Sequence, residues 1–135
     1  MPVEREQQLK LVSSEDIVLV RQAVRQMAAD LGFSLVDQTK LVTAASELAR
    51  NAVIYGGGGT ARIENVNARQ RNGIRVTFED NGPGIADIQQ AMKDGFTTGG
   101  GLGLGLGGSK RLANDFEIRS KPGEGTRVTI TRWKA

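Results

Sequence analysis

The stretch "DGFTTGGGLGLGLGGSKRL" at residues 94–112 places seven glycines in the ten positions 99–108. Glycine loses more conformational entropy on folding than any other residue, so a run this dense indicates a linker or a loop whose backbone approaches a ligand closely. A flexible linker is typically rich in serine, whereas here leucines alternate with the glycines at 102, 104 and 106. We therefore favour a loop that packs down in one state and leads into a helix. The free backbone amides at such a helix start would bind phosphate.

The same stretch completes none of the better-known phosphate motifs. Residues 103–108 satisfy G-x-G-x-x-G, but a dinucleotide-binding loop needs a strand directly before it, and "GFTTGG" stands there instead. No Gly-Lys-Ser/Thr triplet completes a Walker A loop, and the His-Arg-Asp and Asp-Phe-Gly motifs of eukaryotic-type kinases are absent. The chain has no histidine, which excludes Ser-His-Asp hydrolysis, histidine metal sites and phosphohistidine chemistry.

The composition is that of one ordinary soluble domain, which we expect to span residues 1–135. The net charge is +3, with scattered basic residues and few aromatic side chains for base stacking, so we expect no nucleic-acid partner. No apolar run reaches membrane-spanning length, and the polar N-terminus is unlike a signal peptide. Cysteine is absent. We therefore expect a cytoplasmic protein that does not contact a membrane.

Helices are predicted from apolar spacing. Apolar residues at intervals of three and four over residues 17–31 are typical of an amphipathic helix, and Ser13 with Asp16 resembles a capping box at its start. Further helices are expected at 34–55, 84–96 and 104–115.

Strands are predicted where apolar and polar residues alternate, at 9–12, 61–68, 73–80, 115–121 and 126–133. Asn72-Gly73 is a hairpin signal between the second and third of these, and Pro122-Gly123 has the chemistry of a type II turn. The order β-α-α-β-β-α-loop-α-β-β predicts an α+β fold, a two-layer α/β sandwich in which a mixed sheet carries helices on one face.

Two small groups of residues are candidates for ligand binding or catalysis. Asp80 stands at the end of a predicted strand, and Gly82 and Gly84 after it would let the backbone pass close to a flat ligand. The plain alternative is an exit turn. Glu47 and Asn51 lie one helical turn apart on the same helix face. For such a pair taken alone, a solvated polar face is the better explanation.

The order and spacing of these features together are more specific than any one of them. A helix with Glu-x-x-x-Asn precedes a strand with Asp-x-Gly-x-Gly, then a glycine-rich loop, then Gly-x-Gly-Thr leading into a strand. This order resembles the GHKL ATPase superfamily, named for gyrase, Hsp90, histidine kinases and MutL. The resemblance covers residues 13–133 and implies the Bergerat ATP-binding fold. Within it, the chain is most similar to the small bacterial serine/threonine kinases that double as anti-sigma or switch factors.

The resemblance implies ATP and Mg²⁺ as cofactors and a role for each matching residue. Asp80 would accept a hydrogen bond from the adenine amino group, Gly84 would lie against the ring, and Thr126 would hold the same edge through its hydroxyl. Asn51 would bind Mg²⁺ through its side-chain oxygen. Glu47 would act as general base on the attacking hydroxyl. The lid residues that would wrap the phosphates are Gly101, Gly103, Gly105 and Leu106.

The implied function is a Mg-ATP-dependent protein serine/threonine kinase that phosphorylates a STAS-domain regulator and then switches to a second target, a phosphatase or a sigma factor. One alternative is an anti-sigma factor kinase whose main output is sequestering a sigma factor. Another is a nucleotide-gated binding module that catalyses nothing.

Overall fold

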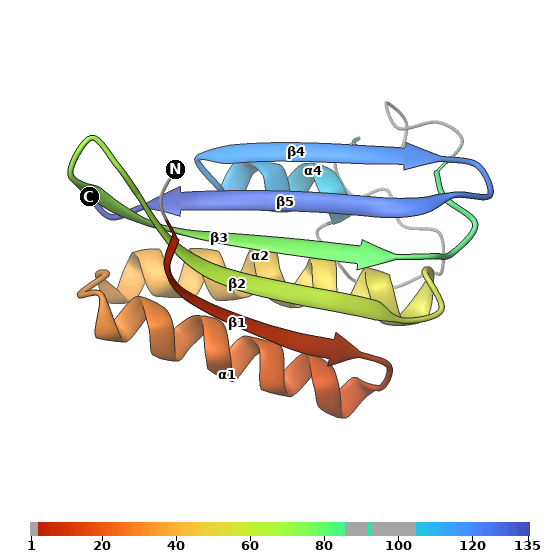
Figure 1. Ribbon diagram of the computed structural model, residues 1–135, viewed down its shortest axis with the longest axis horizontal. Helices are drawn as coiled ribbons and strands as arrows, with labels where there is room; N and C mark the ends of the chain where they lie inside the picture. Colours follow the sequence, from red (N-terminus) through yellow and green to blue (C-terminus); the bar gives the residue numbers. More distant parts are fainter. Residues whose placement is uncertain (1–2, 86–91, 93–104) are drawn as a thin grey trace.

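A five-stranded sheet and a layer of helices on one of its faces form the two layers of the molecule (Figure 1). The computed structural model describes residues 3–85, 92 and 105–135. Its elements, in chain order, are β1 (Val3–Leu11), α1 (Ser14–Asp30), α2 (Leu35–Ile54), β2 (Gly59–Ala68), β3 (Arg71–Asp80), α4 (Gly105–Leu112), β4 (Asp115–Lys121) and β5 (Gly125–Trp133). The predicted two-layer sandwich is confirmed. The helix expected at 84–96 falls almost entirely outside the described residues.

The expected mixed sheet is wrong in one respect, because the described strands pair only antiparallel, in the order β1-β2-β3-β5-β4. The reason lies in the connections. β2 and β3, like β4 and β5, are joined by tight turns, which only antiparallel strands permit. Between β1 and β2 the two helices α1 and α2 run out and back, so β2 starts where β1 ends, with Leu11 opposite Gly59.

The β2–β3 turn lies three residues earlier than Asn72-Gly73. Arg69 and Gln70 form it, with φ of 53° and 64°, the left-handed geometry of a two-residue hairpin turn. Asn72 and Gly73 lie within β3 instead, opposite residues of β2. The Asn72-Gly73 pair is therefore part of a strand in this chain and does not form the hairpin turn.

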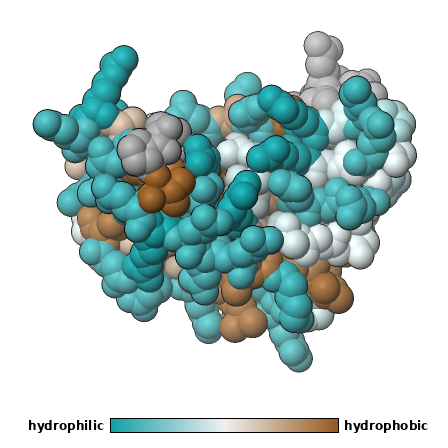
Figure 2. Space-filling view, in the orientation of Figure 1, coloured by the Kyte–Doolittle hydropathy of each residue, from teal (hydrophilic) through white to brown (hydrophobic). Residues whose placement is uncertain are grey.

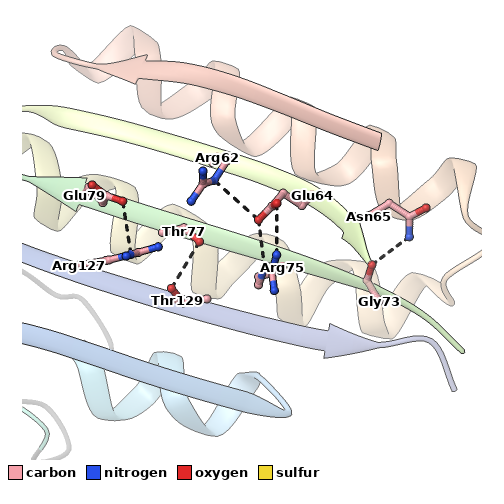
Figure 3. Close-up of polar contacts among 9 residues, drawn as sticks. All are labelled: Arg62, Glu64, Asn65, Gly73, Arg75, Thr77, Glu79, Arg127 and Thr129. Atoms are coloured by element: carbon pink, nitrogen blue, oxygen red, sulfur yellow. Dashed lines mark hydrogen bonds and ion pairs between the residues drawn. The ribbon is translucent and has the colours of Figure 1, made fainter. Parts of the chain in front are cut away.

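Gly73 makes room for an indole. A Cβ at this position would lie 2.6 Å from the Trp133 ring, so any side chain here would displace the tryptophan. The Asn65 side-chain nitrogen donates to the Gly73 carbonyl at 3.1 Å (Figure 3). Packing across β3 and β5 thus overrides the local turn preference.

The core lies between the sheet and the helices, and the predicted stripe of α1 supplies part of it. Val20, Val24 and Met27 are fully buried, while Ile17 and Leu31 at the two ends are partly buried. α2 begins after Ser34, whose Oγ accepts from the backbone N–H of Asp37 at 3.1 Å. This N-cap confirms the predicted helix start.

Asp16 fixes the start of α1. Its carboxylate accepts the backbone N–H groups of Val12 at 2.9 Å and Ser13 at 3.1 Å, which confirms the acidic half of the expected capping box. The Lys10 ammonium lies 3.2 Å away. The hydrogen bond from Val12, above all, lowers the pKa of Asp16 below its ordinary value, with Lys10 and Ser13 adding to the effect.

We expect Asp16→Asn to lower the melting temperature at neutral pH. A depressed pKa contributes stability above the unfolded value of about 4, and this contribution is lost as the pH falls through the folded pKa. Asparagine resembles the protonated acid, so the difference between wild type and variant should vanish on acidification. Thermal unfolding by circular dichroism from pH 7 to pH 2.5 measures it. Glu15→Gln, on the exposed side of the same first turn, is the control, and an equal effect there would contradict the assignment.

Candidate nucleotide site

Three side chains form a row across one end of the sheet. Asp80 on β3 stands opposite Thr126 on β5, which stands opposite Ser120 on β4. Two residues further along, Phe78 and Val128 are buried in the core. Since side chains alternate between the faces of a sheet, the row points to the same side, toward the helices.

Asp80 is a partly buried carboxylate in this row. Its Oδ1 accepts the backbone N–H of Gly82 at 3.0 Å. Burial raises the pKa of the Asp80 carboxyl above its ordinary value, and hydrogen bonds from the backbone of Gly82 and Thr126 oppose that rise. A partly desolvated acid with lone pairs left to accept further donors is a typical ligand-binding group.

Close backbone approaches bring the end of α2 against Asp80. A Cβ at Gly56, just after α2, would lie 2.4 Å from the Asp80 Cγ, and a Cβ at Gly82 would lie 2.7 Å from the Gly56 Cα. The Gly56 N–H donates to the carbonyl of Asn51 at 3.1 Å. The last turn of α2 is therefore held directly beside the exit of β3.

Gly84 is confined from another direction, on the β4 side. Its φ is +76°, and a Cβ there would lie 2.0 Å from the Lys121 carbonyl oxygen. The predicted type II turn after Lys121 is confirmed, with Gly123 at φ +80° and the Glu124 N–H donating to the Lys121 carbonyl at 3.0 Å. The backbone after Asp80 is therefore packed against the β4–β5 turn, and the Gly123 N–H donates to the Pro83 carbonyl at 2.7 Å.

From helix periodicity we infer that Glu47 and Asn51 lie toward the side of α2 that faces α4. Asp37 marks that side, because its carboxylate accepts from Arg132 at 2.7 Å, and Arg132 also donates to the carbonyl of Leu112 at the end of α4. Asn51 follows Asp37 by two heptads, so the two side chains lie close to one line along the helix. Glu47 precedes Asn51 by one turn. Both are partly buried.

α4 brings its first turn to the same end of the molecule as the exit of β3 (Figure 1). It begins at Gly105. The Leu106 side chain is buried in the core, so a contact with phosphate would have to come from its backbone amide. Gly101 and Gly103 lie outside the described residues.

A hollow of about 530 Å³ opens at this end of the sheet. Its lining includes Asp80, Ser120, Gly125 and Thr126, and also Glu79, Arg119 and Arg127, whose side chains belong to the other face of the sheet. Ser120 was missed by the sequence reasoning. The confirmed turn at 121–124 was the available signal, because pairing back across it places Ser120 opposite Thr126.

The other face of the sheet carries no described helix and is polar (Figures 1 and 2). On it, Glu64 accepts two hydrogen bonds from Arg75, at 3.0 and 3.3 Å (Figure 3). Arg127 pairs with Glu79 at 3.4 Å. Most charged groups that the structure describes on this face pair with one another, although the Arg62 Nε has no hydrogen-bond partner. The helix-side end is the candidate site because Asp80, Thr126 and Ser120 lie together there.

The fold and this arrangement define a class of protein. Residues 36–135 match the family model described as "Histidine kinase-, DNA gyrase B-, and HSP90-like ATPase". The chain belongs to this ATPase family, as its resemblance to the GHKL superfamily implied.

Among individual relatives, the chain is 47% identical over 125 residues to the serine/threonine-protein kinase RsbT of Bacillus subtilis, covering 93% of this chain and 94% of the relative. It is 31% identical over 128 residues to an anti-sigma F factor of Thermoanaerobacter, covering 91% and 89%.

Solved structures agree in fold. The RsbU and RsbW domains of Rv1364c from Mycobacterium tuberculosis superpose with a TM-score of 0.67 at 22% identity, over 97% of this chain and 33% of that one. The mycobacterial sensor histidine kinase MprB gives 0.56 at 19% identity, over 96% of this chain and 98% of that one. Within the described ranges, no helix is long and apolar enough to cross a membrane.

Proposed function

We propose that this chain is a Mg-ATP-dependent protein serine/threonine kinase that phosphorylates a partner protein. The observation that carries the proposal is the 47% identity to RsbT, which extends over nearly the whole of both chains. The convergence of α2, the β3 exit and the β4–β5 hairpin at one end of the sheet supports it. ATP use follows from the family; the metal, the residue roles and the partner are the parts we propose.

The adenine would lie against the row at the sheet end. Asp80 would accept from its amino group, and Thr126 would contact the same edge. Gly82 and Gly84 keep side chains out of the space beside Asp80, because their backbones already pack against Gly56 and Lys121. A planar base fits such a flat, partly buried surface.

The phosphates would extend from there toward α2 and α4. Asn51 offers an amide oxygen, a hard ligand that suits Mg²⁺, and Mg²⁺ in kinases also takes oxygen ligands from the phosphates. The metal would neutralise charge on the phosphates. Backbone amides of Gly105 and Leu106 at the start of α4, and of Gly101 and Gly103 before it, would hold the phosphate oxygens.

Glu47 would act on the acceptor. As the serine or threonine oxygen of the partner forms its bond to the γ-phosphorus, the Glu47 carboxylate would take the hydroxyl proton. The bond from the γ-phosphorus to the β,γ-bridging oxygen breaks, and ADP leaves with the electron pair. Glu47 lies one turn from Asn51 on the same side of α2, so the base and the metal ligand would face the same phosphate.

The partner would be a STAS-domain regulator, whose phosphorylation releases the kinase to a second protein, a phosphatase or a sigma factor. A new phosphate on the regulator would repel the nucleotide phosphates and Glu47, which accounts for release. The 31% identity to an anti-sigma F factor supports sigma-factor sequestration less strongly.

The test mixes the purified chain with γ-labelled ATP, Mg²⁺ and STAS-domain proteins encoded near its gene. We expect label on a serine or threonine of one of them, mapped by mass spectrometry, and none when Mg²⁺ is chelated. Label on no candidate, together with retention of a purified sigma factor, would favour the anti-sigma function. ATP binding without either result would favour the non-catalytic module.

A further inference from the structure

Ser120 lies at the centre of a hydrogen-bond network that the proposed residue roles leave unused. Its Oγ lies 2.8 Å from the Thr126 Oγ1 and 3.0 Å from the carbonyl oxygen of Gly125. The backbone N–H of Ile85 donates to the same Oγ at 2.7 Å. One hydroxyl therefore joins the β4–β5 hairpin to the chain that follows Asp80.

The number of protons on these groups determines which of them donate and which accept. A hydroxyl has one proton and two lone pairs. Ile85 occupies one lone pair of Ser120. The Gly125 carbonyl is only an acceptor, so that contact requires the Ser120 proton. The Thr126 hydroxyl must then donate its own proton to the second lone pair of Ser120. No other assignment satisfies all three contacts.

With this assignment of donors and acceptors, the Thr126 hydroxyl has no proton left to donate to a ligand. Beside it in the row stands Asp80, which as a carboxylate is also only an acceptor. The two groups together present acceptors to any bound base. An amino group such as that of adenine satisfies them, whereas the carbonyl of guanine at the corresponding position meets lone pairs.

We propose that Ser120 is a positioning residue that makes Thr126 a hydrogen-bond acceptor, and that it thereby helps the site to select adenine over guanine nucleotides. The inference rests on the proposed adenine position. It concerns binding and not phosphotransfer, so it is tested separately from the kinase activity. The direction of the hydrogen bond between the two hydroxyls is set by the Gly125 carbonyl. Because Ser120 donates its proton to that carbonyl, Thr126 must be the donor to Ser120.

The experiment measures ATP and GTP affinities by titration calorimetry for wild type, Ser120→Ala and Ser120→Thr. In Ser120→Ala the Thr126 hydroxyl rotates freely and can donate to a carbonyl. We expect ATP affinity to fall about two- to tenfold, the usual range for one neutral hydrogen bond, while GTP affinity holds or rises. Ser120→Thr keeps a hydroxyl, so the ratio of its ATP affinity to its GTP affinity should stay within about twofold of the wild-type ratio.

Two further variants separate positioning from a general loss of stability. Glu117→Ala, on the same strand with an exposed side chain on the other face, should change neither affinity. In a Thr126→Val background, Ser120→Ala should no longer alter the ATP-to-GTP ratio, because the group it acts through is gone. An unchanged ratio in Ser120→Ala would overturn the inference, as would equal losses for both nucleotides with a lowered melting temperature. A wild-type chain that binds ATP but labels no partner would count against the proposed function alone.

Discussion

Glu47→Ala should slow phosphate transfer to the partner by about 10²–10⁴-fold, the usual contribution of a general base. The ATP affinity should stay within about twofold of wild type, since the adenine row and the start of α4 do not involve this side chain. Single-turnover transfer from γ-labelled ATP measures the first quantity, and calorimetry measures the second. We expect the two effects to separate because Glu47 lies on α2, whereas Asp80 and Thr126, which we propose to contact adenine, lie on the sheet.

Two variants on the same helix make this result specific. Glu47→Gln keeps the shape and removes the basicity, so it should be nearly as slow as Glu47→Ala. Thr43→Ala, one turn earlier at an exposed position, should transfer at the wild-type rate. Wild-type transfer by Glu47→Ala would show that the base is another residue and that Glu47 belongs to a solvated helix face.

Asp80→Asn should weaken ATP binding about tenfold or more, the cost of losing a charged acceptor in a partly buried site. Asparagine can still accept from the Gly82 N–H through its amide oxygen, so the turn should survive. Its amide nitrogen, however, presents protons where the adenine amino group would donate. The preference for ATP over GTP should therefore shrink or reverse, which calorimetry with both nucleotides would show.

The control for this variant is Glu117→Gln. Glu117 lies on β4 outside the hollow, and its exposed side chain pairs with Arg119 on the other face of the sheet. This variant should bind both nucleotides as wild type does. Equal binding of adenine and guanine nucleotides by the wild-type chain would remove Asp80 from the adenine site.

Local patterns predicted the helices well, because burial of one face leaves a regular apolar spacing. The stripe over 17–31 and the cap at Ser34 are examples. The β2–β3 turn was misplaced because the decisive partner of Gly73 is Trp133, sixty residues later in the chain. No local signal reports such a contact.

In the candidate site, too, some features could be predicted from the sequence and others depend on contacts between distant residues. Motif order was the basis for predicting Asp80, Thr126, Glu47 and Asn51 as site residues, and their roles stay predictions. The side of α2 on which Glu47 and Asn51 lie is inferred from the Asp37–Arg132 contact between α2 and β5, and only the folded chain reveals that contact. The role of Ser120 likewise depends on the register of β4 with β5.

The position of β5 in the sheet has a consequence for how the chain reaches this state. β5 is the last of the described strands in sequence, yet it lies between β3 and β4, inside the sheet. During synthesis, β3 must therefore wait with one edge unpaired until residues 125–133 have left the ribosome. Such late, non-local pairing slows folding and exposes a strand edge to other chains. The row formed by Asp80, Thr126 and Ser120 is therefore complete only after β5 has paired with both β3 and β4.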